Sequence, residues 1–441
     1  MYLLILTETE NNNNKQSVYF SADPNGTPVI KATKGMKKHL KMHQITMGLL
    51  QERMSKYREP QKYINAGVYP YFREIDSHQD TEVTMSGKQV LMFGSNSYMG
   101  LTYDKRICEA AINAIKKYGT GCAGSRFLNG TLDLHIQLEK ELAEFVGKDE
   151  ALVYSTGFTV NSGVVSCLTG RNDYIIGDDR DHASIVDGRR LSFSQFFHYK
   201  HNDMEDLEHQ LMRCNPDSLK LIVIDGLFSM EGDLAKLPEI IELKKKYNAT
   251  VMVDEAHGLG VFGRNGRGVC DHFGLTDDVD LIMGTFSKSL ASIGGFIASD
   301  SDTINWLRHN SRTYIFSASN TPAATAAALE ALHILQQEPE RQENLWKITN
   351  YALEQFKQAG FEIGDTESPI IPLYVRDAFK TFEVTKKAFD KGVFVNSVVP
   401  PACAPQDTLI RVALMATHTK EQVDRCVAIL VDVFKELKLL K

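Results

Sequence analysis

The chain has 441 residues, of which 43% are hydrophobic and 24% charged, a composition typical of a globular protein long enough for two domains. Its formal net charge of −7 argues against a nucleic-acid-binding protein with a broad basic face. No apolar run is long enough to predict a membrane span. The seven cysteines are scattered, without a CxxC pair or a zinc-like spacing, so we expect no metal site. Such a set predicts reduced thiols in a cytoplasmic protein.

The first 45 residues differ from the rest of the chain. They contain the homopolymer Asn11–Asn14 and a basic stretch over 31–41, and neither shows a sustained period. We therefore expect residues 1–45 to be poorly ordered or weakly attached. A helix is predicted over 47–56, and we hypothesise that translation starts at Met47. Residues 46–95 form an N-terminal segment that leads into the first domain.

From about residue 83 the chain alternates short apolar runs with helical patterns. Strands are predicted over 90–93, 151–154, 174–176, 221–224, 250–253, 281–283 and 295–298. Helices between them include 133–146, where apolar residues recur at near-helical spacing, and 237–247. Short strands without polar alternation, separated by helices, indicate an α/β fold with a mostly parallel sheet covered on both faces. We assign this large domain to residues 96–325.

The pattern changes near residue 322. A long alanine-rich helix is predicted over 323–337, and strands are predicted over 372–375 and 410–414. This part of the chain, residues 326–441, is predicted to form a smaller C-terminal α+β domain.

The most informative stretch is Gly284–Ser289, which follows the predicted strand 281–283. A lysine held where the chain leaves a sheet, here Lys288, can lose water, lower its pKa and act as an amine nucleophile. The hydroxyls of Thr285 and Ser287, together with free backbone N–H groups, can hold a phosphate. An amine nucleophile beside a phosphate site suggests the Schiff-base cofactor pyridoxal phosphate, whereas an isolated lysine here would more often be an ordinary surface residue.

A carboxylate follows the predicted strand 250–253. Open α/β sheets bind their ligands at the carboxyl ends of their strands, where Asp254 lies. A pyridoxal ring needs an anionic partner for its protonated nitrogen, and His257, three residues later, could bind the ring's phenolic oxygen. Alone, Asp254 would more often be a turn or helix cap, but paired with Lys288 at the end of another strand it favours a cofactor site.

Two further segments follow predicted strands. The stretch 154–161 opens a helix, and its backbone N–H groups at the positive end of the helix dipole form a natural phosphate site. The stretch 181–184 places His182 where an imidazole could stack on the cofactor ring. Each signal is weak alone, because many such turns contain Ser, Thr and Gly, and an isolated histidine is more often structural.

Together these residues resemble the α-oxoamine synthase family of fold type I pyridoxal-phosphate enzymes, whose members join an amino acid to an acyl-CoA and release CO₂. The resemblance runs from about Tyr69 to the C-terminus. It rests on separated motifs at 96–101, 124–126 with 129–131 and His135, 181–184, 228–233, 254–258, 284–285 with Lys288, and 400–401.

The resemblance implies a role for each matching residue. Lys288 would hold the cofactor as a Schiff base, and Asp254 would pair with the ring nitrogen. His182 would stack on the ring, with His257 and Ser229 near its phenolic oxygen. Residues at the phosphate would be Gly157, Phe158, Thr285 and Ser287, and those at the substrate carboxylate Asn96 and Arg411. The family builds its active site across a homodimer, so the segment 317–322 of a partner subunit would reach the phosphate, although Asn320 and Thr321 depart from the proline pair of many relatives.

The lysine motif narrows the branch of the family. It reads Thr-Phe-Ser-Lys-Ser, whereas oxononanoate synthases and amino-ketobutyrate ligases usually have Thr-Leu-Gly-Lys-Ala. Together with segments 67–73 and 128–135, this motif is typical of the branch that condenses L-serine with palmitoyl-CoA, a long-chain acyl-CoA, to 3-oxosphinganine in the first step of sphingolipid synthesis. Because such a thioester is amphipathic, peripheral contact of the protein with a membrane is a further possibility.

Three alternatives remain. The first is another α-oxoamine synthase, such as 8-amino-7-oxononanoate synthase or glycine C-acetyltransferase, with a different amino acid and a shorter acyl-CoA. The second is an aminotransferase of the same fold. The third is a non-catalytic partner subunit, against which the presence of Lys288 argues.

Overall fold

The computed structural model describes residues 18–22, 28–32 and 48–440, and the chain divides into two compact units, 1–62 and 63–441. The first unit contains the antiparallel strands β1 (Val18–Ala22) and β2 (Pro28–Ala32) and the helix α1 (Leu49–Ser55). Helix α2 (Glu59–Asn65) begins in this unit and ends in the second. Helix α1 lies within the predicted range 47–56. Met47 and most of residues 1–45 lie outside the described residues, so the expectations for both stay predictions.

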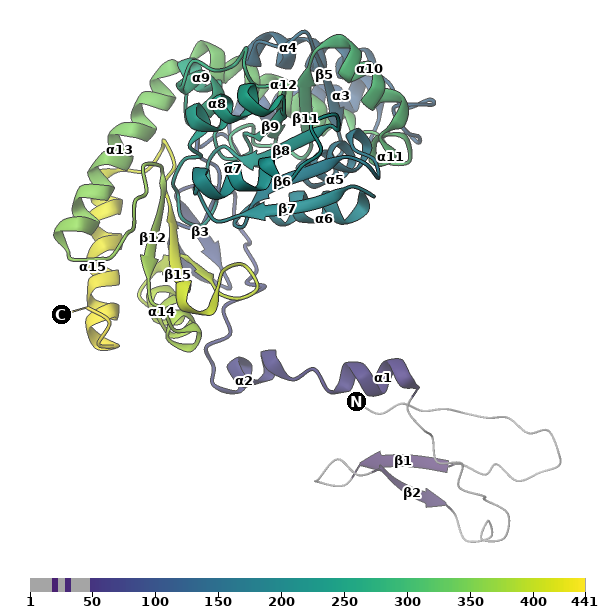
Figure 1. Ribbon diagram of the computed structural model, residues 1–441. Helices are drawn as coiled ribbons and strands as arrows, with labels where there is room; N and C mark the ends of the chain where they lie inside the picture. Colours follow the sequence, from purple (N-terminus) through teal and green to yellow (C-terminus); the bar gives the residue numbers. More distant parts are fainter. Residues whose placement is uncertain (1–17, 23–27, 33–47, 441) are drawn as a thin grey trace, which may run out of the picture. The chain divides into compact units, whose positions relative to one another are not determined.

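A seven-stranded sheet forms the centre of the second unit, with helices on both faces (Figure 1). Its strands, in spatial order, are β5 (Glu150–Tyr154), β11 (Gly295–Ser299), β10 (Leu281–Thr285), β9 (Thr250–Asp254), β8 (Lys220–Asp225), β6 (Tyr174–Asp178) and β7 (Gln195–Tyr199). Of these seven strands, β11 runs opposite to the other six, which confirms the mostly parallel sheet.

The sheet is apolar on both faces because successive side chains of a strand point to opposite sides. In β8, Leu221 and Val223 join one hydrophobic cluster, whereas Ile222 and Ile224 join the other. The helices that accompany this sheet are α3 (Lys105–Tyr118), α4 (Asp133–Val146), α5 (Gly157–Leu168), α6 (Ala183–Leu191), α7 (Met204–Met212), α8 (Leu237–Tyr247), α9 (Val269–His272), α10 (Ser301–Asn310), α11 (Arg312–Ile315) and α12 (Pro322–Gln337), with the 3₁₀ turn η1 (Arg264–Gly266).

Two further three-stranded sheets combine four strands of the C-terminal part of the chain with two strands from residues 82–92. One sheet has the order β12 (Ile370–Tyr374), β15 (Leu409–Ala413), β14 (Asn396–Val398), and the other β13 (Val393–Phe394), β4 (Lys88–Met92), β3 (Glu82–Met85). The helices are α13 (Pro339–Gln358), α14 (Ala378–Asp390) and α15 (Lys420–Glu436), with the 3₁₀ turn η2 (Pro405–Asp407). This arrangement agrees with the predicted α+β character.

One predicted strand belongs to a different sheet from the one expected. The sequence pattern groups the run 90–93 with the strands of the large parallel sheet, but the corresponding strand β4 pairs with β3 and with β13, where Val393 lies opposite Leu91. The partner strand comes from the C-terminal region, about 300 residues later, so no local pattern could identify it. The domain boundaries at 45, 95 and 325 stay predictions.

The described residues include no helix that is both long and apolar enough to cross a membrane. The strands β6, β8, β9 and β10 run parallel, so their carboxyl ends meet at one edge of the large sheet. This edge carries the site.

Candidate active site

Two connected cavities bring all eleven predicted site residues together. The smaller, of about 300 Å³, lies at the carboxyl edge of the large sheet, and the larger, of about 910 Å³, extends to the C-terminal sheets. Both are lined by His182, His257 and Lys288. The smaller is also lined by Gly157, Phe158, Asp254, Thr285 and Ser287, and the larger by Asn96, Ser229 and Arg411.

Lys288 lies three residues beyond the end of β10 and is half-buried. Burial, assisted by the positive charge of Arg411, lowers the pKa of its amine to about 8. The carboxylates of Asp254 and Asp225 act in the opposite direction and favour the charged amine. Because β9 and β10 are neighbouring parallel strands, in which Met283 lies opposite Asp254, the amine and the carboxylate reach the same cavity as predicted.

Asp254 is buried, and both of its oxygens accept hydrogen bonds. The Nδ2 of Asn161 donates to Oδ2 over 2.6 Å, and the backbone N–H of Ala256 donates to Oδ1 over 2.8 Å. The same Nδ2 also donates to the Oγ of Ser184 over 2.9 Å. Asn161 therefore fixes the carboxylate in one orientation and joins it to the next helix.

His182 precedes α6 and caps it. Its Nδ1 accepts from the backbone N–H of Ser184 over 3.2 Å and lies 2.7 Å from the Oγ of Ser184, while its own backbone N–H donates to Oδ2 of Asp225 over 2.7 Å. Burial and the nearby Lys288 lower the pKa of His182, against the raising effect of Asp254. The lowered pKa favours a neutral imidazole, whose position is fixed by Asp225 at the end of β8 and by Ser184 in α6.

His257 belongs to a second chain of hydrogen bonds. Its Nδ1 lies 2.7 Å from the hydroxyl of Tyr98, and that hydroxyl accepts from Nη2 of Arg411 over 3.2 Å. The Nε of Arg411 donates to the backbone carbonyl of Ser229 over 2.6 Å. Burial, with the positive charges of Lys288 and Arg411, holds the pKa of His257 well below its usual range. Residues from four separated segments of the chain are joined in this way.

The smaller cavity is also lined by hydroxyls and by the N-terminus of a helix. Thr285 Oγ1 lies 3.1 Å from Ser287 Oγ, and Thr156 caps α5 by accepting from the backbone N–H of Thr159. The first N–H groups of α5 have no partner carbonyl within the helix, and the dipole there favours an anion. At Gly157 the helix approaches β10 closely, since a Cβ would lie 2.8 Å from Thr285 Oγ1. Hydroxyls and free N–H groups of this kind are suited to bind an oxyanion.

Asn96 lies on the wall of the larger cavity. Its Oδ1 is buried and has no hydrogen-bond partner among the described residues. An unpaired buried amide oxygen is costly, so this side chain is available for a ligand with a hydrogen-bond donor, and its Nδ2 for an acceptor. Arg411 supplies a guanidinium to the same cavity from β15.

Four residues of these networks have no role in the predictions. Tyr98, Asn161 and Ser184 fall inside motifs noted in the sequence, but nothing in one motif indicates which side chain turns toward another. Asp225 could have been found, because it follows the predicted strand 221–224 directly, just as Asp254 follows 250–253.

The donor set fits pyridoxal phosphate. An amine with a pKa of about 8 suits an aldehyde, a carboxylate fixed by Asn161 suits a protonated ring nitrogen, and hydroxyls beside the start of α5 suit a phosphate. The three groups line one cavity.

Comparison with known proteins agrees with this chemistry. The family model described as aminotransferase class I and II matches residues 88–430. The serine palmitoyltransferase of Bacteroides thetaiotaomicron is 77% identical over 394 residues, which cover 89% of this chain and 100% of the relative. That of Sphingobacterium spiritivorum is 58% identical over 90% of this chain and 99% of its own. A serine palmitoyltransferase variant from S. paucimobilis, solved with a bound PLP–myriocin aldimine, superposes with a TM-score of 0.87 at 34% identity, over 89% of this chain and 100% of that one.

Proposed function

Because the chain belongs to the aminotransferase class I and II family and, within it, to the α-oxoamine synthases, we propose that it condenses L-serine with palmitoyl-CoA. The products would be 3-oxosphinganine, CoA and CO₂, in the first step of sphingolipid biosynthesis. The chain is an acyltransferase whose cofactor is pyridoxal phosphate. The observation that carries the proposal is the meeting of Lys288 and Asp254 in one cavity, in a chain 77% identical to a serine palmitoyltransferase.

The cofactor supplies the electron sink that stabilises a carbanion at Cα of serine. Lys288 would hold the cofactor's aldehyde and, once released from it, would take the proton from Cα. Its pKa of about 8 leaves a useful fraction of neutral amine near physiological pH. Asp254 would keep the ring nitrogen protonated, and Asn161 prevents its carboxylate from turning away.

Other residues would orient the substrate and the ring. Asn96, Arg411 and His182 would hold the carboxylate of serine, which delays the loss of CO₂ until the new carbon–carbon bond has formed. His182 would also cover one face of the ring, and His257 and Ser229 would lie near its phenolic oxygen. Both histidines have lowered pKa values, so they would act as neutral hydrogen-bonding groups. The phosphate would be bound by Gly157, Phe158, Thr285 and Ser287.

We also propose that the active unit is a homodimer. Two large apolar side chains that line the smaller cavity, Phe158 and Ile293, are exposed on the single chain, as are Phe127, Leu128 and Phe316. The segment 317–322, which follows Phe316, is held by hydrogen bonds that include those from Ser155 Oγ to the carbonyl of Ala318 and from the N–H of Ser319 to the carbonyl of Gly124. A partner's copy of this segment could then add hydroxyls to the phosphate site.

The seven cysteines are all unpaired, which supports a reducing compartment, and we propose the cytoplasm. The enzyme would contact a membrane surface when it takes up the amphipathic thioester, and co-sedimentation with lipid vesicles measures this contact directly.

The test of the proposed reaction is product mass spectrometry. L-Serine, L-alanine and glycine are each supplied with acyl-CoAs of increasing chain length, and the Lys288→Ala variant serves as the inactive control. Serine with palmitoyl-CoA should give 3-oxosphinganine and CO₂. Preferential use of alanine or glycine with a short acyl-CoA would show another α-oxoamine synthase, and conversion of the cofactor to its amine form by glutamate would show an aminotransferase.

A further inference from the structure

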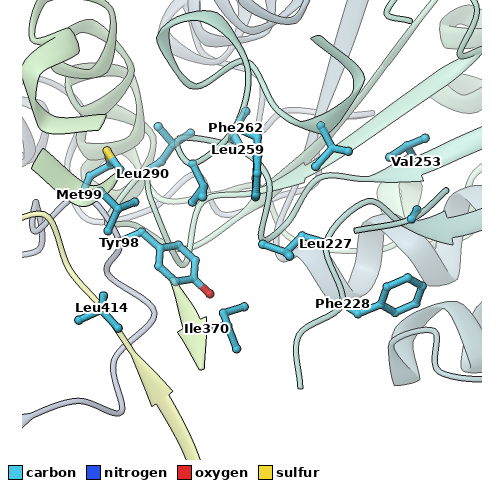
Figure 2. Packing of buried hydrophobic residues seen from close by; sticks show 14 of the residues in the cluster. Tyr98, Met99, Leu227, Phe228, Val253, Leu259, Phe262, Leu290, Ile370 and Leu414 are labelled. Carbon is cyan, nitrogen blue, oxygen red and sulfur yellow. The ribbon is translucent and has the colours of Figure 1, made fainter. Parts of the chain in front are cut away.

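Tyr98 is a fully buried tyrosine that the proposed mechanism leaves without a task. Its ring lies in the main hydrophobic cluster with Met99, Leu259 and Leu290, and its hydroxyl is on the side away from Met99 (Figure 2). Packing alone would be satisfied by phenylalanine. The hydroxyl, however, makes two hydrogen bonds, and both partners line the larger cavity.

These two hydrogen bonds have a definite direction. Arg411 carries only donors, so the hydroxyl of Tyr98 must accept from it. The hydroxyl then has one proton to donate, and Nδ1 of His257 lies 2.7 Å away. If Nδ1 carried the ring proton instead, the hydroxyl would accept twice and its own proton would have no acceptor among the described residues. Tyr98 therefore places the proton of the neutral imidazole on Nε2.

We infer that Tyr98 is a positioning residue that fixes the tautomer of His257 and couples it to Arg411. The inference rests on the proposed function, in which Arg411 holds the serine carboxylate and His257 lies near the ring oxygen. A change in Arg411 when serine binds would alter the hydrogen bond that Tyr98 accepts, and so the one it donates to His257. Amino-acid binding and the protonation of the cofactor would then be linked through one hydroxyl.

The surrounding charges are consistent with this assignment. The groups that face His257 are Lys288, Arg411 and His182, and each of them disfavours an imidazolium. Burial raises the pKa of Tyr98, against the lowering effect of Arg411, so its hydroxyl retains the proton that it donates. Neither partner needs to change its charge for the coupling to operate.

The chain offers a control for the removal of a buried hydroxyl. Tyr199, at the end of β7, is also fully buried, but its hydroxyl has no hydrogen-bond partner among the described residues, and it lines neither cavity. Tyr98→Phe and Tyr199→Phe remove the same atom from equally buried rings. An effect of removing a buried hydroxyl as such would therefore appear in both variants, whereas an effect of the hydrogen bonds to His257 and Arg411 would appear in Tyr98→Phe alone.

The experiment measures three quantities in the holoenzymes: the ratio of the cofactor's absorbance bands across pH 6–10, the Kd for L-serine, and the Tm. Tyr98→Phe should change the band ratio and weaken serine binding by about three- to tenfold, the effect of losing one hydrogen bond. Tyr199→Phe should change neither. In an Arg411→Lys background, Tyr98→Phe should weaken serine binding less than it does in the wild type, because the coupling is already broken.

The inference is overturned if Tyr98→Phe matches Tyr199→Phe in band ratio and serine Kd, whatever its Tm. If the wild type itself fails to bind serine, the proposed function fails, and the band ratio still decides the role of Tyr98. If Tyr98→Phe does not fold, nitrogen NMR of the histidine-labelled wild type decides instead, with His257→Gln to assign the signal. A proton on Nε2 of His257 supports the inference, and a proton on Nδ1 overturns it.

Discussion

The reactivity of Lys288 in the cofactor-free enzyme provides a sharp test of the site's electrostatics. With a pKa of about 8 instead of 10.5, the neutral amine at pH 7 is about 9% of the total instead of about 0.03%, an increase of about 300-fold. Pulse labelling with an amine-specific reagent, followed by peptide mass spectrometry, measures this fraction directly. The labelling rate of Lys288 should rise about tenfold per pH unit below pH 7 and level off above about pH 8.

Two substitutions test the cause of the lowered pKa. Asp254 favours the charged amine and Arg411 disfavours it, so Asp254→Asn should move the labelling midpoint to lower pH and Arg411→Gln to higher pH. The exposed Lys105, labelled in the same sample, provides the reference. A labelling curve of Lys288 that coincides with that of Lys105, or shifts of the same sign in both variants, would refute the reasoning.

Three further predictions concern buried contacts. Asn161→Asp replaces the amide that lies 2.6 Å from Asp254 with a second carboxylate. Because the two carboxylates repel each other, this variant should bind the cofactor at least about tenfold more weakly in an absorbance titration. Gly157→Ala pushes Thr285 Oγ1 away from a contact of 2.8 Å and should also weaken cofactor binding, with the circular dichroism spectrum unchanged. Arg126→Met removes the guanidinium that donates two hydrogen bonds to the buried Glu139 and leaves this carboxylate without its ion-pair partner. The free energy of unfolding in urea should fall by about 3–5 kcal/mol, and most of the loss should be recovered in Arg126→Met/Glu139→Leu.

The central part of the site could be predicted because strand ends are visible in the sequence. A buried parallel strand is a short apolar run, and the residue that follows it must lie at the carboxyl edge of the sheet. This reasoning predicts that Lys288 and Asp254 share one site, and both residues line the smaller cavity. The same reasoning, applied to 221–224, would have located Asp225 as well.

The hydrogen-bond networks could not be predicted in the same way. Asn161 reaches Asp254 across 93 residues of sequence, and Tyr98 reaches Arg411 across 313. Which atom of such a side chain meets which partner depends on the packing of several elements at once, and no period in the sequence records it. The prediction that 90–93 joins the large sheet is wrong for a related reason, because the partner strand β13 follows about 300 residues later in the sequence.

The two networks together determine how charge is distributed around the ring position. In one network Asn161 donates to Asp254 and to Ser184, and Ser184 is hydrogen-bonded to His182. In the other, Tyr98 orients His257. The pKa values of both histidines are lowered, so neither competes as a cation for the carboxylate. The negative charge of Asp254 is therefore left for the ring nitrogen and for Lys288, which are the two groups whose protonation the proposed reaction must control.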